Sequence, residues 1–192
     1  MTTDSLFTLC ELGEDMDDKF LYFGYGSNML TKRLRAANRA PSAALHGRGH
    51  VTGRKLTFHK VSDDGSGKCD MRVTGDANDC VEGVLFWIAK TDKRGLDEAE
   101  GLGRGYAESI VDVVTENGTE KALAYVATNT AASRVPYHWY KALVVAGALE
   151  HRLPPAYVDA IRGITSKPDL REDRRTKREA ESALEGTGVS PA

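Results

Sequence analysis

The chain has 192 residues, of which 41% are hydrophobic and 28% charged, which suits one ordinary domain with flanking segments. Its 26 Lys and Arg nearly balance 28 Asp and Glu, so composition argues against a nucleic-acid or membrane partner and favours a small-molecule ligand. The three cysteines form no C-x-x-C pair, and no basic, apolar signal sequence is present, so we expect a reducing, cytoplasmic location.

The first elements in chain order are a leader and a strand–loop–helix unit. Residues 1–18 are polar and acidic, and we expect them to form a leader outside the main domain. Residues 20–25 are apolar and aromatic, which predicts a buried strand. Ser27 or Asn28 is then placed to cap a helix that ends at Pro41.

The middle of the chain is dominated by strand patterns. Alternating and continuous apolar runs predict strands within residues 46–89, and residues 92–100 predict a short helix that stops at a glycine. Two further strands, 110–114 and 123–126, flank Asn117-Gly118, a pair typical of a hairpin because both residues tolerate positive φ.

Helices return towards the end of the chain. Pro136 and Pro154-Pro155 each open a helical pattern, and residues 168–192 form a charged tail that predicts a solvated helix or a disordered end. The order of elements predicts one α+β domain over residues 19–167, with a mixed, barrel-like curved β-sheet and flanking helices.

The loop from Gly24 to Asn28 fits none of the common nucleotide or nucleophile motifs. A dinucleotide-binding G-x-G-x-x-G would need glycine where Met29 stands, and Ser27 lies in no G-x-S-x-G elbow. His46 and His50 are four residues apart, but the glycines between them make a helix, and hence a metal site, unfavourable. We therefore expect no metal.

What remains of this loop is a strand that runs into a helix through two glycines. The glycines allow close approach of a ligand to the backbone, and the first N–H groups of a helix have no internal partners. Such a loop favours a small anion such as a carboxylate. The alternative is a tight turn in which Ser27 is an ordinary helix cap.

Glu100 is the candidate acid–base group. Leu96 and Glu100 share one face of the predicted helix, whereas Glu98 points away from it. Partial burial and the negative end of the helix dipole both disfavour the charged carboxylate, which suits a general acid–base catalyst. The alternative is a surface acid on a charged helix, and Asp97 is the second choice.

Three segments together resemble one known family. The run Tyr22-Phe23-Gly24-Tyr25-Gly26-Ser27-Asn28 resembles the signature of the γ-glutamylcyclotransferase superfamily, and Leu96-Asp97-x-x-Glu100-Gly101 is similar to its second motif. Pro136 to Lys141, Gly147-Ala148 and Leu153-Pro154-x-x-Tyr157 resemble its C-terminal region, so the ordered match spans about residues 20–165.

The resemblance implies a barrel-like γ-glutamylcyclotransferase fold for the catalytic domain, without metal or organic cofactor. It implies an enzyme that releases 5-oxoproline from a γ-glutamyl substrate when the substrate's own amine attacks its γ-carbonyl. Glu100 would be the general acid–base, and the Tyr-Gly-Ser-Asn form favours the γ-glutamyl-amino-acid and γ-glutamylamine branches. The substrate-binding residues it implies are Tyr22, Phe23, Gly24, Tyr25, Gly26, Ser27 and Tyr140.

Two alternatives stay open at the level of sequence. One is a non-catalytic carboxylate-binding module of the same fold, against which the presence of Glu100 argues. The other is a specialised cyclotransferase that removes a γ-glutamyl protecting group from a metabolite. The leaving group and the oligomeric state, including a homodimer, are left open.

Overall fold

The computed structural model describes residues 18–191, so the expected leader lies outside the described residues except for Asp18. The strands are β1 (Lys19–Gly24), β2 (Ala44–Thr52), β3 (Arg54–Val61), β4 (Gly67–Val73), β5 (Cys80–Ala89), β6 (Tyr106–Thr115) and β7 (Gly118–Ala127). The helices are α1 (Thr31–Leu34), α2 (Lys93–Glu100), α3 (His138–Glu150), α4 (Pro155–Gly163) and α5 (Arg175–Leu184), with 3-10 turns at Ser27–Met29 and Lys90–Asp92.

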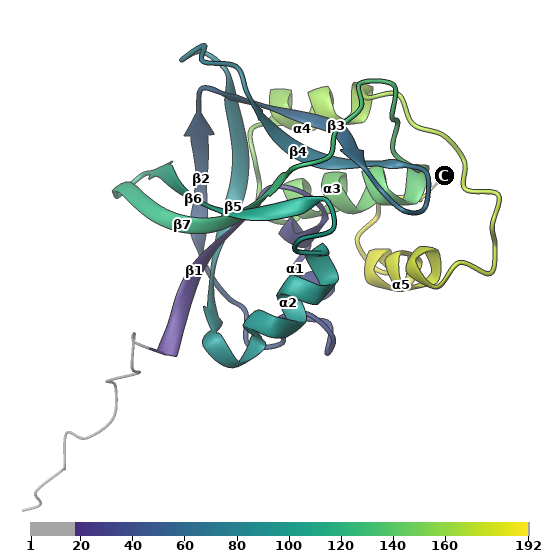
Figure 1. The fold of residues 1–192 in the computed structure, drawn as a ribbon, viewed down its shortest axis with the longest axis horizontal. Coiled ribbons are helices and arrows are strands. Elements are labelled where there is room, and N and C mark those ends of the chain that lie inside the picture. Colours follow the sequence, from purple (N-terminus) through teal and green to yellow (C-terminus); the bar gives the residue numbers. More distant parts are fainter. Residues whose placement is uncertain (1–17, 192) are drawn as a thin grey trace, which may run out of the picture.

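Five strands close into a barrel in the order β1-β5-β2-β6-β7, and β3 and β4 form a separate two-stranded arm (Figure 1). β1 runs antiparallel to β5, with Leu21 opposite Trp87, and meets β7 in parallel at Tyr22 and Leu123. The helices pack outside this sheet, so the expected α+β fold with a barrel-like mixed sheet and flanking helices is confirmed.

Local chemistry explains how the barrel closes. A side chain at Gly83 of β5 would place its Cβ 2.5 Å from the ring of Phe23, so glycine lets β1 and β5 pack closely. The expected hairpin between β6 and β7 is confirmed, but its turn lies one residue earlier than the sequence indicated. Thr115 pairs with Gly118, and Glu116 and Asn117 form the turn between them.

α3 is the central helix of the structure. Trp139, Tyr140 and all residues from 142 to 148 are buried, which is expected of a helix that is apolar around most of its circumference. It packs against the 3-10 turn at Ser27–Met29 as well as against α4 and α5. Within the described residues, no helix is long and apolar enough to cross a membrane.

Two expectations for the helices need correction. The helix expected after Asn28 is only a 3-10 turn followed by the four-residue α1, because the chain turns away to pack against α3. The charged tail is neither disordered nor fully solvated, because α5 buries Ala180, Ala183 and Leu184 and packs on α3 (Figure 1). The buried residues stand at i, i+3 and i+4, which is the spacing of one helical face.

Candidate active site

A small pocket forms where the loop after β1 meets the end of α2, β4 and α3. Its enclosed volume is about 20 Å³, enough for one water-sized group. We call it the Glu100 pocket, and it is lined by Tyr22, Tyr25, Gly26, Ser27, Asn28, Cys69, Glu100, Tyr106, Tyr125 and Tyr140. Five of these ten residues are tyrosines, so rigid aromatic walls surround one carboxylate.

Glu100 is the last residue of α2, and the helix stops there because Gly101 takes a left-handed conformation with φ 72°. Leu96, one turn earlier, is fully buried and holds this face of the helix against the core. The side chain of Glu100 is 17% exposed, whereas that of Glu98 is 66% exposed. The sequence prediction of which acid faces inward is therefore confirmed.

The carboxylate of Glu100 has two polar neighbours. Asn28 donates a hydrogen bond from Nδ2 to Oε1 of Glu100 at 2.6 Å. Arg39 lies 3.7 Å from the same oxygen, and its Nη1 donates to Oδ1 of Asn28 at 3.3 Å. The amide of Asn28 therefore connects the cation and the carboxylate and fixes Glu100 against the loop.

The loop after β1 is held by close backbone contacts. A Cβ at Gly26 would lie 3.0 Å from Cβ of Cys69, and one at Gly147 would lie 2.5 Å from the backbone nitrogen of Leu30. Both glycines therefore permit contacts that a side chain would disturb. The backbone N–H groups of Gly26 and Asn28 donate to no backbone carbonyl in the described part of the chain, and both residues line the pocket.

Neither expected cap works as a helix cap. The hydroxyl of Ser27 accepts a hydrogen bond from Nε of Arg33 at 3.1 Å, and the side-chain amide of Asn28 donates its hydrogen bond to Glu100. The ordinary-cap alternative for Ser27 is therefore wrong, because its hydroxyl pairs with Arg33 and caps no backbone N–H of the turn.

Hydrogen bonds fix the tyrosines around the pocket. The hydroxyl of Tyr25 donates to the carbonyl of Tyr125, and that of Tyr106 donates to the carbonyl of Cys69, each at 2.5 Å. The N–H of Cys69 donates to the hydroxyl of Tyr140 at 3.1 Å. The tyrosines thereby tie together strands and a helix that are far apart in the sequence.

Burial keeps these groups neutral. It raises the pKa of the phenols well above the ordinary value at Tyr22, Tyr25, Tyr106 and Tyr140. Burial also raises the pKa of the Cys69 thiol to about 12. The pocket therefore presents neutral hydroxyl and thiol groups around the single carboxylate of Glu100, and none of them is suited to act as a nucleophile at neutral pH.

Asp97, the second choice for the acid–base role, does not line the pocket. It accepts hydrogen bonds from the hydroxyl of Tyr125 and from the ammonium of Lys93. Its position behind Tyr125 supports the aromatic wall and leaves Glu100 as the carboxylate that faces the pocket.

Most of the residues implied by the family resemblance come together here. Six of them line the pocket, namely Tyr22, Tyr25, Gly26, Ser27, Tyr140 and Glu100. Phe23 and Gly24 do not, and Phe23 is fully buried against the core because successive residues of β1 face opposite sides.

Sequence reasoning missed four contributors to the site. Tyr125 and Arg39 gave no signal, because their proximity to Glu100 exists only in the folded chain. Cys69 and Tyr106 were not among the site residues expected from the sequence. The alternation of β7 could have separated Tyr125 from Ala122 and Ala124, which lie on the other face of the sheet.

A second, larger hollow opens elsewhere on the barrel, between β2, the turn of the β6–β7 hairpin and the start of α4. Its volume is about 560 Å³. We call it the β2 cleft, and it is lined by His46, Gly47, Arg48, Gly49, His50, Glu82, Leu85, Val114, Thr115, Glu116, Asn117, Glu120, Arg152, Pro154 and Pro155. His46 lies 2.9 Å from a carboxylate oxygen of Glu120.

Comparison with known proteins gives a consistent result. A profile of the AIG2-like family matches residues 80–161. Gamma-glutamylcyclotransferase of Homo sapiens is 34% identical over 157 residues, which are 77% of this chain and 80% of the human protein. The Mus musculus protein of the same name is 33% identical over 156 residues, covering 77% and 79%. A solved structure of a gamma-glutamyl cyclotransferase superposes with a TM-score of 0.74 at 29% identity, covering 88% of this chain and 99% of its own.

Proposed function

Because the chain belongs to the γ-glutamylcyclotransferase family and is an enzyme of that type, we propose that Glu100 is its general acid–base catalyst. In the proposed reaction a γ-glutamyl compound cyclises to 5-oxoproline and releases a free amino acid or amine. The observation that carries the proposal is the contact of Glu100 with Asn28 at 2.6 Å, which joins the catalytic carboxylate to the loop of the Glu100 pocket.

The reaction needs no nucleophile from the protein. The substrate's α-amine attacks its own γ-carbonyl carbon, a new C–N bond closes the five-membered ring, and the C–N bond to the leaving amine breaks. Glu100 takes the proton that the attacking nitrogen loses and later gives it to the leaving nitrogen, so protons balance without water. Its partial exposure and its place in the pocket lining support this role.

The remaining groups have binding roles in this proposal. The unpaired N–H groups of Gly26 and Asn28 would hold the substrate's carboxylate or the oxyanion that develops on the γ-carbonyl oxygen. The aromatic walls formed by Tyr22, Tyr125 and Tyr140 would keep the substrate folded so that its amine faces the carbonyl. Substrate-binding roles for Tyr25 and Ser27 are proposed on the same ground.

The test combines a substrate panel with one isosteric change. The purified protein is incubated with γ-glutamyl dipeptides, γ-glutamylamines and glutathione, and 5-oxoproline is measured. We expect product from at least one class of substrate. Glu100→Gln is expected to lower kcat by about 10²- to 10⁴-fold, because it keeps the shape and removes the proton carrier.

The matched control is Glu98→Gln, on the same helix, whose side chain pairs with the exposed Arg94. It should retain wild-type turnover, and both variants should melt within a few degrees of the wild type. Near-normal kcat in Glu100→Gln would contradict the catalytic role. Absence of 5-oxoproline from every member of the panel would contradict the reaction itself.

A further inference from the structure

The β2 cleft is a second concave site that the proposed reaction does not use. Its volume of about 560 Å³ is within the range of small-molecule sites, and none of its lining residues also lines the Glu100 pocket. Two of its charged residues, Glu82 and Arg152, have no ion pair and no side-chain hydrogen bond within residues 18–191. The cleft therefore presents one acid and one base that the protein itself leaves unpartnered.

The strand that borders the cleft, β2, continues past its pairing with β6. The ladder between them contains one residue pair, His50 with Val114, so residues 44–49 have no strand partner on that edge within the described chain. Gly47 lies in this part, next to a β-bulge, and a Cβ there would meet no atom within 4 Å. Packing therefore does not require glycine at this position, and the bare strand edge leaves room for another backbone.

Glu82 brings a carboxylate to the cleft. It stands on β5 directly opposite His50 of β2, so the two side chains lie on the same face of the sheet. Burial raises the pKa of Glu82, and the charges of His50 and Arg48 partly oppose this without forming an ion pair with it. A half-buried carboxylate without a cationic partner favours a positively charged ligand.

Arg152 brings a cation to the cleft from a backbone position that suits glycine. It follows α3 and has a φ of 53°, and among residues 18–191 it is the one residue other than glycine with a positive φ. Glycine is the usual residue at such a position after a helix, because any side chain is unfavourable there. The local backbone therefore gives no reason for an arginine, whereas its place in the cleft lining does.

The acid and the base are attached to β2 two residues apart. Glu82 pairs with His50, and Arg48 donates a hydrogen bond to the carbonyl of Arg152 at 2.6 Å. Two residues of an extended chain span about 7 Å. This is close to the separation of the ammonium and the carboxylate in an extended α-dipeptide.

We propose that the β2 cleft binds a free α-dipeptide in extended form beside β2, with its ammonium at Glu82 and its carboxylate at Arg152. The peptide group between them meets the open edge of β2 near Gly47, as in strand addition. Glu120 is not available for the ammonium, because it already pairs with His46. This inference does not rest on the function proposed above, since no residue that it uses lines the Glu100 pocket.

The test compares the binding of three peptides to the full chain by isothermal titration calorimetry. Alanylalanine carries both terminal charges, N-acetylalanylalanine lacks the ammonium, and alanylalaninamide lacks the carboxylate. Alanylalanine should bind, and each blocked peptide should bind about 10- to 100-fold more weakly, the range for one hydrogen bond to a charged group. No binding of alanylalanine at about 1 mM, or equal affinity for all three peptides, would overturn the inference.

Two substitutions test the two ends of the peptide separately. Arg152→Gly should melt no lower than the wild type, because glycine is favoured at this φ, yet it should bind alanylalanine about tenfold more weakly. Its affinity for alanylalaninamide should not change. Glu82→Gln should weaken alanylalanine by about 10- to 100-fold and leave N-acetylalanylalanine unaffected. Unchanged affinity for alanylalanine in either variant would contradict the proposed contacts.

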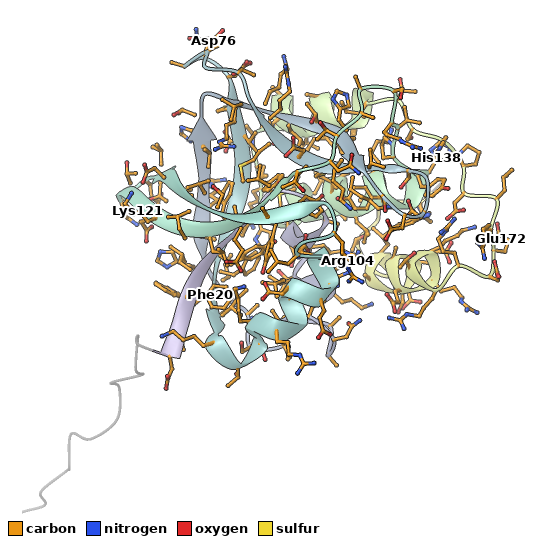
Figure 2. The ribbon with its side chains drawn as sticks, in the orientation of Figure 1. Phe20, Asp76, Arg104, Lys121, His138 and Glu172 are labelled. Carbon is orange, nitrogen blue, oxygen red and sulfur yellow. The ribbon has the colours of Figure 1, made fainter. Side chains whose placement is uncertain are left out.

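Two controls locate the peptide. Lys121, at the outer end of the β6–β7 hairpin, pairs with Asp112 and does not line the cleft, so Lys121→Met should bind alanylalanine as the wild type does (Figure 2). Glu100→Gln should also keep wild-type affinity for alanylalanine. Loss of binding in Glu100→Gln would place the peptide in the Glu100 pocket and overturn the inference. Failure to form 5-oxoproline would contradict the proposed reaction alone.

Discussion

The Glu100 pocket and the β2 cleft differ in size and in the chemical groups that line them, and the larger of the two does not hold the candidate catalytic residues. The cleft measures about 560 Å³ and the pocket about 20 Å³, yet the pocket holds most of the residues that the family resemblance implies. In the cleft, His46 pairs with Glu120, and Arg48 donates to the carbonyl of Arg152 at 2.6 Å. In the pocket, neutral hydroxyls and unpaired N–H groups surround one carboxylate.

The difference teaches that convergence of chemical groups, and not volume, marks the site. A catalytic carboxylate needs partners that fix its position while leaving one side open to the substrate. Asn28 and Arg39 provide this for Glu100. Matched substitutions in the pocket and in the cleft can test the contrast directly.

The largest expected contrast comes from an Asn-to-Asp change in each region. Asn28→Asp places a second carboxylate at hydrogen-bond distance from Glu100, and two adjacent carboxylates cannot both be ionised without strong repulsion. We expect kcat/KM for the preferred substrate to fall by about 100-fold at pH 7, the lower end of what an acid–base group contributes. Steady-state assays of 5-oxoproline formation measure it.

Its control is Asn117→Asp in the exposed hairpin turn that lines the cleft. Aspartate is as acceptable as asparagine in such a turn, so activity and melting temperature should match the wild type. Similar losses of activity in Asn28→Asp and Asn117→Asp would show that the effect is not specific to the Glu100 pocket.

A smaller contrast is expected from removing one arginine in each region. Arg39→Met removes the cation 3.7 Å from Glu100 and should lower kcat/KM by about tenfold, equivalent to about 1.4 kcal/mol. Arg48→Met removes a cation from the cleft and should leave kcat/KM unchanged. A greater loss of activity in the Arg48 variant would place the chemistry in the cleft.

The smallest effect concerns His151, which lies between the two regions. Nε2 of His151 is 2.9 Å from the carbonyl of Met29 beside the pocket loop, and the next residue, Arg152, lines the cleft. Burial lowers the pKa of His151, although the neighbouring Glu150 opposes this. Below about pH 6.5 the unfolded chain therefore takes up the proton first, so the free energy of unfolding should fall as the pH falls.

Urea unfolding at pH 7.5, 6.5 and 5.5 measures this loss. The His151→Asn variant should lose less stability over the same range, since its side chain does not titrate. The other titrating groups are common to both proteins, so the difference in slope isolates His151. Identical slopes would show that the buried ring contributes nothing to the pH dependence.

The parts of the fold that were predictable are those determined by nearby residues. The strand before Gly24, the helix before Gly101 and the β6–β7 hairpin follow from apolar periodicity and glycine placement. The helix after Asn28 was mispredicted because Met29 and Leu30 pack against α3, a contact that local spacing does not encode. Tertiary packing overrides weak local preference there.

The sequence predicted the two parts of the candidate site separately, namely the loop after β1 and Glu100, but it did not predict the contact between them. Burial on the Leu96 face singled out Glu100 from Glu98, and the glycines marked the loop as a place of close approach. The bond that joins the two parts, from Asn28 to Glu100, spans 72 residues and has no signature in either segment. The wall formed by Tyr106 and Tyr125 depends on how β6 and β7 pack against the loop after β1 and could not be inferred beforehand.

The closure of the barrel also bears on how the protein is made. β1 is the first strand of the described chain, but its strand partners come much later in the sequence: Tyr22 pairs with Phe86 of β5 and with Leu123 of β7. Pairings so distant in sequence fold slowly, and during synthesis β1 has no strand partner until β5 has emerged from the ribosome, while its contact with β7 forms later still. Tyr140 completes the pocket still later. A nascent or truncated chain that ends before α3 therefore lacks one wall of the Glu100 pocket, however well its early strands are formed.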